Sequence, residues 1–378
     1  MIVHLMNDDK FVDGAMERFE LAAPGRNLFL IQTDRNRWDP RRFVPRRYLR
    51  QHPELDIVGS KLATPVAAAR LGPDVRDRAV AAVVFHSLDR GRLRLIKRIR
   101  PDVRVAWFGW GIDYYPTILR DRFPDPDGIL GPRTRVLRRE LPGGPRPRVR
   151  PLDRSAYGRI DLFVPVLRAE WELARELHPW FRPDYLPWRY GSATGERLPI
   201  VAAKEPTGVL VGNSAALTNN HLDAFDALAS AGRASSFDRV VVPLSYGDVR
   251  VRSRIIDEGR RRFGERFIPL TDFLPRPEYE AVLASCHTLV LGHIRQQALG
   301  NVSLAVRAGL RLVMHSQSVL RAELERSGLV IDDLDRFAPG PLPPQVVAQN
   351  RLAYRAFRRG YEDPAATRRV VDWLLADR

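Results

Sequence analysis

The segment VLVGNSAALTNNHLDAF has the residue types and the spacing that suit a bound diphosphate. Gly212 allows a ligand to approach the backbone closely, and Asn213, Ser214 and Thr218 have side chains that can donate hydrogen bonds. A helix is expected to begin near Asn219, and free backbone N–H groups at the positive end of a helix dipole attract a diphosphate. An ordinary capped helix after a parallel strand gives the same pattern, so this turn alone favours a structural role.

A second turn of the same kind favours diphosphate binding over a purely structural role. In LVLGHIRQQALGNVSLAVRAG, Arg295 follows an apolar run and offers a charge-assisted contact to a phosphate. A third turn, in PLSYGD, places Ser245 and Tyr246 after another apolar run. Ligands of open α/β folds bind at the carboxyl edge of the sheet, so the three turns predict one donor-binding site. Its predicted residues are Gly212, Asn213, Ser214, Asn219, Tyr246, Arg295, Gln296, Gln297, Gly300 and Asn301.

In the first half of the chain, VRVAWFGWGIDYYP places one acid among aromatic residues where the chain must turn. Asp113 can serve as a catalytic base or bind a sugar, and the aromatic rings can stack on a pyranose face. The alternative is that Asp113 caps the helix that follows it. Asp9 and His86, each at the end of an expected strand, are further catalytic candidates, although a lone histidine is more often structural.

The sequence favours a reaction without a metal or another cofactor. The motif Asp125-Pro126-Asp127 matches the letters of an Asp-x-Asp chelate but lies in a proline-rich segment. The first expected strand is followed by neither a Walker loop nor a GxGxxG motif, which weakens kinase and dehydrogenase readings. The single cysteine, Cys286, excludes an internal disulfide and is best read as a buried small hydrophobic residue.

Apolar runs alternate with helical patterns along the chain, which predicts an α/β fold with mostly parallel sheets. In the first half, strands are expected at 1–6, 27–33, 79–87, 103–111 and 160–166. In the second half they are expected at 208–214, 239–246, 266–273, 287–293 and 311–316.

The 378 residues are enough for two such domains. We expect an N-terminal acceptor-side Rossmann-like domain over 1–185 and a linker over 186–206. A nucleotide-sugar-binding Rossmann-like domain is expected over 207–342. The last helices, over 343–378, are expected to break near Asp363-Pro364 and to pack back on the first domain.

The net charge is +16, and arginine clusters concentrate it in the first half. A solvated arginine-rich surface, an anionic membrane or lipid-linked acceptor, and nucleic acid are all compatible with such charge. Nucleic-acid binding is the least favoured of the three interpretations, since the sequence has no zinc-finger spacing or RNA-binding aromatic motif. The initial apolar stretch, MIVHLM, is short and acids follow it, so we expect a cytoplasmic protein, peripheral at most to the inner membrane face.

Four segments carry a resemblance to a known family: WFGWGIDYY, VLVGNSAALTNNHLDAF, VVVPLSYGD and EYEAVLASCHTLVLGHIRQQALGNVSLAVRAGLRLVMH. Their order and separations resemble the enterobacterial common antigen N-acetylfucosaminyltransferase family of 4-alpha-L-fucosyltransferase-like glycosyltransferases, over roughly residues 80–320. Three features depart from that family: an arginine-rich insertion around 121–150, His287 where the family usually has an acid, and LVLGHI where the family has an aromatic-rich strand before the arginine.

The resemblance implies a GT-B fold, in which two Rossmann-like domains face a cleft. It also implies a dTDP-sugar donor and an undecaprenyl-pyrophosphate-linked saccharide acceptor. By position, it marks Asp113 and most of the predicted donor residues.

We therefore expect a metal-independent glycosyltransferase that moves a fucose-type or N-acetylated amino-deoxy sugar from a nucleoside-diphosphate donor to a glycan or lipid-linked acceptor. The rival readings are a sugar-nucleotide epimerase of the same build and a basic membrane- or nucleic-acid-binding module. Product analysis separates the three, because an epimerase returns an isomerised sugar nucleotide and a binding module returns no product.

Overall fold

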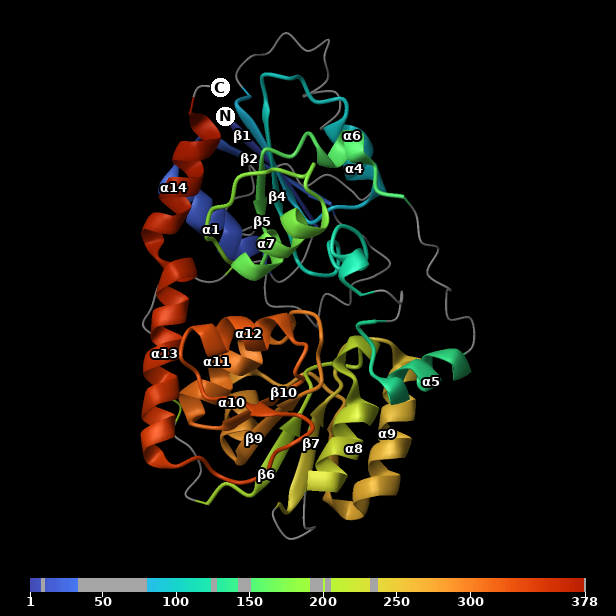
Figure 1. Ribbon diagram of the computed structural model, residues 1–378. Coiled ribbons are helices and arrows are strands. Elements are labelled where there is room, and N and C mark those ends of the chain that lie inside the picture. The colour runs from blue at the N-terminus through green and yellow to red at the C-terminus, as the bar shows by residue number, and fades with distance from the viewer. Residues whose placement is uncertain are drawn as a thin grey trace. The chain divides into compact units, whose positions relative to one another are not determined.

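The computed structural model describes residues 1–7, 11–32, 80–123, 128–141, 151–190, 200, 205–231 and 237–376. The chain forms two compact units, each with its own parallel sheet (Figure 1). Unit 1 comprises Met1–Arg122, Arg150–Glu196 and Arg358–Arg378. Unit 2 comprises Phe123–Val149 and Arg197–Phe357.

The sheet of unit 1 has the strand order β2-β1-β3-β4-β5, and all its pairings are parallel. Its strands are β1 (Ile2–Asn7), β2 (Asn27–Gln32), β3 (Ala82–His86), β4 (Arg104–Phe108) and β5 (Leu162–Val164). The helices of the unit are α1 (Val12–Ala22), α4 (Arg90–Ile96), α6 (Arg154–Tyr157), α7 (Arg168–Leu177) and α14 (Pro364–Leu375), with a 3-10 turn at Arg120–Arg122.

Strands β3 and β5 are buried at every position, as expected for a parallel sheet covered on both faces. The core against α1 includes Phe19 and Trp188 and is completed by the last helix, whose Val370 and Leu374 are fully buried. The hydroxyl of Thr367 on α14 accepts hydrogen bonds from Arg18 Nε (3.0 Å) and Trp188 Nε1 (2.9 Å). The end of the chain thus lies against its first helix.

The sheet of unit 2 has the order β11-β10-β9-β6-β7-β8 and is also parallel. Its strands are β6 (Gly208–Val211), β7 (Arg239–Pro243), β8 (Phe267–Leu270), β9 (Cys286–Leu291), β10 (Arg311–Met314) and β11 (Asp332–Asp333). The helices are α5 (Pro132–Glu140), α8 (His221–Ala231), α9 (Val249–Phe263), α10 (Arg276–Ala284), α11 (Leu299–Ala308), α12 (Val319–Arg326) and the first part of α13 (Pro344–Glu362), with 3-10 turns at Leu217–Asn219 and Gly264–Arg266.

Two expected domain boundaries differ from the structure. Most of α13, up to Phe357, belongs to unit 2 and not to the first domain, and so does α5. The carboxylate of Asp223, on α8, accepts hydrogen bonds from the backbone N–H groups of Arg133 (2.8 Å) and Thr134 (3.1 Å). Gly131, at the N-cap of α5, has no side chain to do this. Asp223 therefore supplies the cap from a distant part of the sequence.

Helices α13 and α14 meet at the expected break. Asp363 separates them and caps α14 by accepting a hydrogen bond from Ala365 N, while Pro364 occupies the first turn. Among the residues that the structure describes, no helix is both long enough and apolar enough to cross a membrane.

Candidate functional site

The turns that follow β6, β7 and β9 lie side by side at the carboxyl edge of the sheet in unit 2. This follows from the strand order, in which β6 is hydrogen-bonded to β9 on one side and to β7 on the other. A backbone bridge between Ala215 and Gly247 extends the β6–β7 pairing into the turns themselves. The structure thus brings together the three polar turns of the sequence.

A chain of side-chain hydrogen bonds connects the three turns. The hydroxyl of Thr218 donates to Gln297 Oε1 (2.8 Å), and Gln297 Nε2 donates to Asn213 Oδ1 (3.0 Å). Asn213 Nδ2 then donates to the hydroxyl of Tyr246 (3.0 Å). Gln297 is buried, whereas Tyr246 is 42% exposed, so this series of hydrogen bonds runs from the interior to the surface.

Asn219 holds the loop after β6 in place. Its Oδ1 accepts from Asn213 N (2.9 Å), and its Nδ2 donates to the carbonyl and hydroxyl oxygens of Ser214 (2.9 and 3.0 Å). His293 Nε2 lies 3.0 Å from the same Oδ1 and must carry the proton, because an amide oxygen only accepts. Asn219 and Ser214 are both buried, so this pair shapes the turn.

Gly212 has a conformation that other residues rarely adopt, with φ of +70°. A Cβ at this position would lie 2.6 Å from His221 Nε2 and 3.0 Å from Asn219 Oδ1. Glycine is therefore required for the turn to pack against His221.

Two buried neutral histidines lie beneath these turns. Burial lowers the pKa of His221 to about 3 and holds the pKa of His293 well below its usual value, with the charge of Arg295 adding to the effect on His293. His221 Nε2 and His293 Nδ1 are buried and have no hydrogen-bond partner among the described residues. The positive charge at this edge therefore comes from Arg295 and not from the imidazoles.

The N-terminus of α11 has no side-chain cap, and Gly300 in its first turn is exposed. Its N-cap residue, Ala298, adopts a left-handed conformation with φ of +60° and provides no side-chain cap. Around Gly300, a Cβ would have no heavy atom within 4 Å. A helix N-terminus without a side-chain cap leaves backbone N–H groups that can bind an anion. Arg295, which is half-buried, lies in the turn that leads into this helix.

The residue pattern alone did not mark Tyr279 or Asn220. Asn301 Nδ2 donates to the hydroxyl of Tyr279, on α10, at 2.9 Å. Asn220, with φ of +52°, donates to the carbonyl of Gly292 (2.8 Å) and accepts from Gly131 N (2.9 Å). The second asparagine of the pair 219–220 was the available signal, because asparagine tolerates the left-handed region better than most residues.

In unit 1, the carboxylate of Asp113 is buried among three N–H donors. Oδ2 accepts from Leu88 N (2.9 Å) and Trp107 Nε1 (2.8 Å), and Oδ1 accepts from Trp110 N (2.9 Å). Burial raises the pKa of Asp113, and the three donors act in the opposite direction. The donors precede Asp113 in the sequence, so it joins the ends of β3 and β4 and does not cap a following helix. This geometry favours a positioning role over that of a catalytic base.

His86 is also buried, and both of its ring nitrogens are engaged. Nε2 lies 3.1 Å from His4 Nδ1, and Nδ1 lies 2.6 Å from the hydroxyl of Tyr190. Burial, reinforced by the nearby His4 and Arg92, holds the pKa of His86 well below its usual value. A neutral histidine fixed on both sides is suited to a structural role. Asp9 lies outside the described residues.

Arg92 is a feature of this edge that the sequence patterns did not indicate. Its guanidinium is buried and donates to the carbonyls of His86 and Ser87 (both 2.9 Å) and to Asn7 Oδ1 (2.7 Å). It thereby holds Ser87 in a left-handed conformation with φ of +77°. Strained non-glycine residues at strand ends often mark functional sites.

Three half-buried aromatic rings lie at the same edge. The ring of Phe11 is 5.3 Å from that of Trp110 and 4.9 Å from that of Tyr190, centroid to centroid. Tyr190 in turn contacts His86. Such rings can stack on the apolar face of a pyranose.

Among the described residues, no group of three His, Cys, Asp or Glu side chains could hold a metal ion. The Asp125-Pro126-Asp127 motif lies outside those residues. Cys286 is buried, as expected, and burial raises the pKa of its thiol to about 11.

Comparison with known proteins relates this fold and site to sugar transfer. Residues 182–351, which contain all three turns, match the family model described as 4-alpha-L-fucosyltransferase, glycosyl transferase group 56. This confirms the fucosyltransferase-like resemblance.

Solved structures with the same fold cover almost the whole chain at low identity. The lipopolysaccharide outer core galactosyltransferase WaaB has a TM-score of 0.57 and 10% identity, with 98% of each chain covered. The alpha,alpha-trehalose-phosphate synthase (UDP-forming) of Burkholderia vietnamiensis has a TM-score of 0.60 and 12% identity over 99% of each chain. Anabaena HepE, solved with UDP and glucose, has a TM-score of 0.59 and 11% identity over 98% of each chain.

These likenesses confirm the expected fold of two Rossmann-like domains. The chain is a glycosyltransferase with the GT-B fold, and its segment 182–351 matches the 4-alpha-L-fucosyltransferase group.

Proposed function

We propose that this glycosyltransferase takes its sugar from a nucleoside-diphosphate donor bound at the carboxyl edge of the sheet in unit 2. The observation that carries the proposal is the N-terminus of α11 without a side-chain cap, beside the hydrogen-bonded turns of Asn213, Tyr246 and Gln297. The diphosphate would accept hydrogen bonds from the N–H groups at the start of the helix, with Arg295 neutralising its charge. The UDP bound to Anabaena HepE supports this donor class.

The donor site would act on the leaving group. When the bond between the sugar and the diphosphate breaks, negative charge builds up on the β-phosphate. Backbone donors and a guanidinium that are already in place stabilise that charge without reorganisation. This chemistry needs no divalent metal, so we propose a metal-independent reaction.

For the sugar, we propose a fucose-type or N-acetylated amino-deoxy hexose, carried on dTDP. The support is the match of residues 182–351 to the fucosyltransferase model, together with the family resemblance of the turns. GDP and UDP donors are the alternatives to test beside dTDP.

For the acceptor, we propose a lipid-linked saccharide, such as one carried on undecaprenyl pyrophosphate. Its sugar would stack on the Phe11, Trp110 and Tyr190 rings at the carboxyl edge of the sheet in unit 1. Buried Asp113 and Arg92 would position the turns that carry these rings. An acceptor at the membrane surface would make the enzyme peripheral to the inner membrane face.

The first experiment is calorimetric titration of the full chain with dTDP, UDP and GDP in the presence and absence of EDTA. We expect one of the three to bind clearly more tightly than the others, with and without EDTA. Incubation with the matching sugar nucleotides and a lipid-linked saccharide should then release the nucleoside diphosphate. Failure to bind any of the three would refute the donor site. Activity that EDTA abolishes and magnesium or manganese restores would refute the metal-free mechanism, and an isomerised sugar nucleotide as product would reveal an epimerase.

A further inference from the structure

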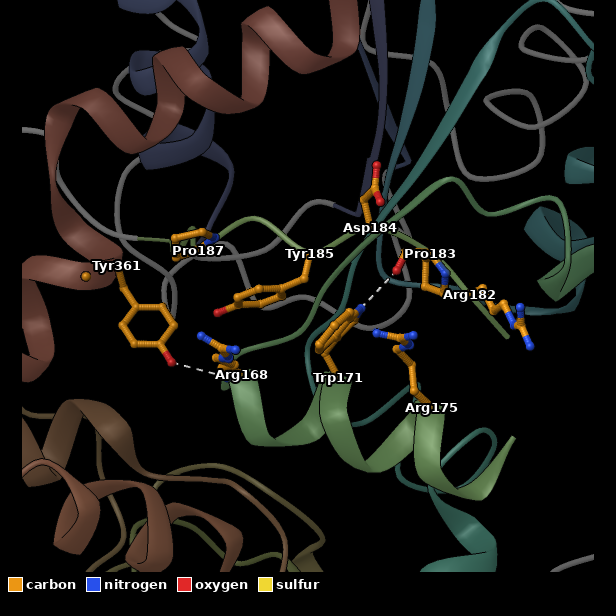
Figure 2. Close-up of a pocket in the computed structure, with 10 residues that line it drawn as sticks. Arg168, Trp171, Arg175, Arg182, Pro183, Asp184, Tyr185, Pro187 and Tyr361 are labelled. Carbon is orange, nitrogen blue, oxygen red and sulfur yellow. Dashed lines mark hydrogen bonds between the residues drawn. The ribbon is translucent and has the colours of Figure 1, made fainter. Parts of the chain in front are cut away.

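A cavity of about 710 Å³ lies on unit 1, over the outward face of α7 (Figure 2). Its walls include three guanidinium groups and three aromatic rings, those of Arg168, Arg175, Arg182, Trp171, Tyr185 and Tyr361. None of the residues that line it belongs to the predicted donor site, and all of them lie in unit 1. It is therefore a different site from the turns of unit 2.

The helix and the segment that follows it build this cavity together. Arg168, Trp171 and Arg175 occur at spacings of three and four residues, which places them on one face of α7. The chain then returns beside β5, where Asp184 pairs with Leu162. Trp171 Nε1 donates a hydrogen bond of 3.0 Å to the carbonyl of Pro183, which fixes the ring against the returning segment.

The third wall comes from the last part of the chain. The hydroxyl of Tyr361, at the end of α13, accepts a hydrogen bond of 3.2 Å from the backbone N–H of Arg168. The buried guanidinium of Arg189 lies 3.4 Å from the centre of the Tyr361 ring. Tyr361 thus holds the start of α7, and its ring packs against the Arg189 guanidinium.

The arginines of the cavity are incompletely neutralised. Arg168 pairs with Glu172 through Nε alone (2.8 Å), and Arg175 stacks over the Trp171 ring at 4.7 Å. Arg182 Nε donates to the carbonyl of Pro179 (2.9 Å). Within the described part of the chain, neither Arg175 nor Arg182 has a carboxylate partner.

The carboxylate at the cavity wall does not change this balance. Asp184 accepts a hydrogen bond of 3.0 Å from Trp373 Nε1. Figure 2 shows its carboxylate pointing away from Arg168 and Arg175. The cavity therefore presents positive charge between aromatic rings.

We infer that this cavity binds a phosphate or pyrophosphate group carried on an amphiphilic molecule. A guanidinium group can bind two oxygens of one phosphate at once, through two parallel N–H donors. Tryptophan and tyrosine rings beside them suit a ligand whose polar head continues into an apolar body, as in a phospholipid or a lipid-linked saccharide. An extended nucleic acid would need a longer basic groove than this single cavity provides.

The test measures binding to the full chain in two arms, both read by the tryptophan fluorescence to which Trp171 contributes. One arm uses vesicles of phosphatidylcholine with or without phosphatidylglycerol, and the other uses inorganic pyrophosphate in solution. The variant is Arg168→Gln together with Arg175→Gln. The matched control is Arg261→Gln together with Arg326→Gln, which removes the same charge from exposed, salt-bridged helix positions of unit 2.

We expect the pocket variant to lose about tenfold or more in affinity and the control variant to lose little, because hydrogen bonds to charged groups are the strong ones. Loss confined to phosphatidylglycerol vesicles identifies a lipid headgroup, and loss of pyrophosphate binding identifies a soluble phosphate; either result supports the site. Three results would overturn the proposed phosphate site. They are equal losses of affinity in both variants, preferential binding of RNA over phosphate in a competition, and no binding by the unmodified chain. Nucleoside-diphosphate affinity, measured on the same samples, keeps this outcome separate from that of the donor proposal.

Discussion

The side-chain amide of Gln297 donates a hydrogen bond of 3.0 Å to the side-chain carbonyl of Asn213. The bond ties the turn after β9 to the turn after β6, although 84 residues separate the two in sequence. Both amides have a second partner, Thr218 for Gln297 and Tyr246 for Asn213. Their orientations are therefore fixed before any donor binds, which lowers the entropic cost of binding.

Removing either amide should weaken the donor site through the same contact. We expect Gln297→Ala and Asn213→Ala each to reduce nucleoside-diphosphate affinity by several-fold, about 0.5–1.5 kcal/mol for one hydrogen bond. The double variant should lose less than the sum of the two, because both changes break one shared bond. Calorimetry on the four proteins measures the coupling, and strictly additive losses would show that the two turns act independently.

Arg295 should contribute more than either amide. Arg295→Ala would remove the proposed charge-assisted contact to the diphosphate, and such a contact is worth about 1.5–3 kcal/mol or roughly tenfold or more in affinity. Arg295→Lys keeps the charge but not the planar fork, so we expect an intermediate loss. Titration with the preferred nucleoside diphosphate checks both variants, and unchanged affinity in Arg295→Ala would remove this residue from the site.

Two glycines of the donor site should respond oppositely to alanine. Gly212→Ala places a Cβ 2.6 Å from His221 Nε2 at a φ of +70°, so the melting temperature should fall by several degrees. Gly300→Ala meets no atom within 4 Å and improves helix propensity, so stability should hold or rise by up to about 1 kcal/mol.

Donor affinity should nevertheless fall in Gly300→Ala, because a helical Cα–Cβ bond is tilted toward the helix N-terminus, where we propose that the diphosphate binds. Thermal unfolding and calorimetry on the same two samples separate the effects. A Gly300→Ala protein with full donor affinity would place the diphosphate elsewhere.

Asp113→Asn tests whether the Asp113 carboxylate acts as a catalytic base or only positions the turns around it. The two carboxylate oxygens of Asp113 accept hydrogen bonds from Leu88 N, Trp107 Nε1 and Trp110 N. Asparagine replaces one of these oxygens by an N–H₂ group, which cannot accept. That N–H₂ group would then face at least one of the three N–H donors without a hydrogen bond. We expect a loss of stability of about 1–3 kcal/mol, seen as a lower melting temperature. Turnover per folded molecule should change little, whereas normal stability with a large loss of turnover would restore the catalytic-base hypothesis.

The buried histidines predict a stability that declines in acid. His221 has a folded-state pKa of about 3 against an ordinary value of 6.5, so below pH 6.5 the unfolded chain binds a proton that the folded chain does not. Stability should therefore fall as the pH drops below 6.5, by about 1.4 kcal/mol per pH unit for each such group. His221→Gln should make the decline in melting temperature between pH 7 and pH 5 shallower, and an unchanged slope would show that other groups dominate.

The strand and turn pattern of the sequence was sufficient to predict most of the fold and the three adjacent turns at which we propose that the donor binds. Apolar runs followed by small polar residues identified the turns at Gly212, Tyr246 and Arg295, because strand ends and helix starts are local signals. The break at Asp363-Pro364 was equally local.

Contacts between residues far apart in the sequence could not be predicted from these local patterns. The sequence does not show that Asp223 caps α5, so it could not assign that helix to unit 2. In the same way, three donors turn Asp113 into a buried support, and one of them, Leu88 N, lies on another strand end. Arg92 had no motif to mark it, since its partners are two carbonyls and Asn7.

The division of the chain into units has a consequence for its synthesis. Unit 1 includes Met1–Arg122 but also needs Arg358–Arg378, which is synthesised only after Arg197–Phe357 of unit 2. Until then, the surface of Phe19 that α14 covers and the hydrogen-bonding groups of Arg18 and Trp188 lack their final partners. The sheet of unit 1 is thus made before the sheet of unit 2, but its core is completed only after unit 2. A nascent chain, or one truncated before α14, therefore exposes an apolar surface that favours aggregation or chaperone binding.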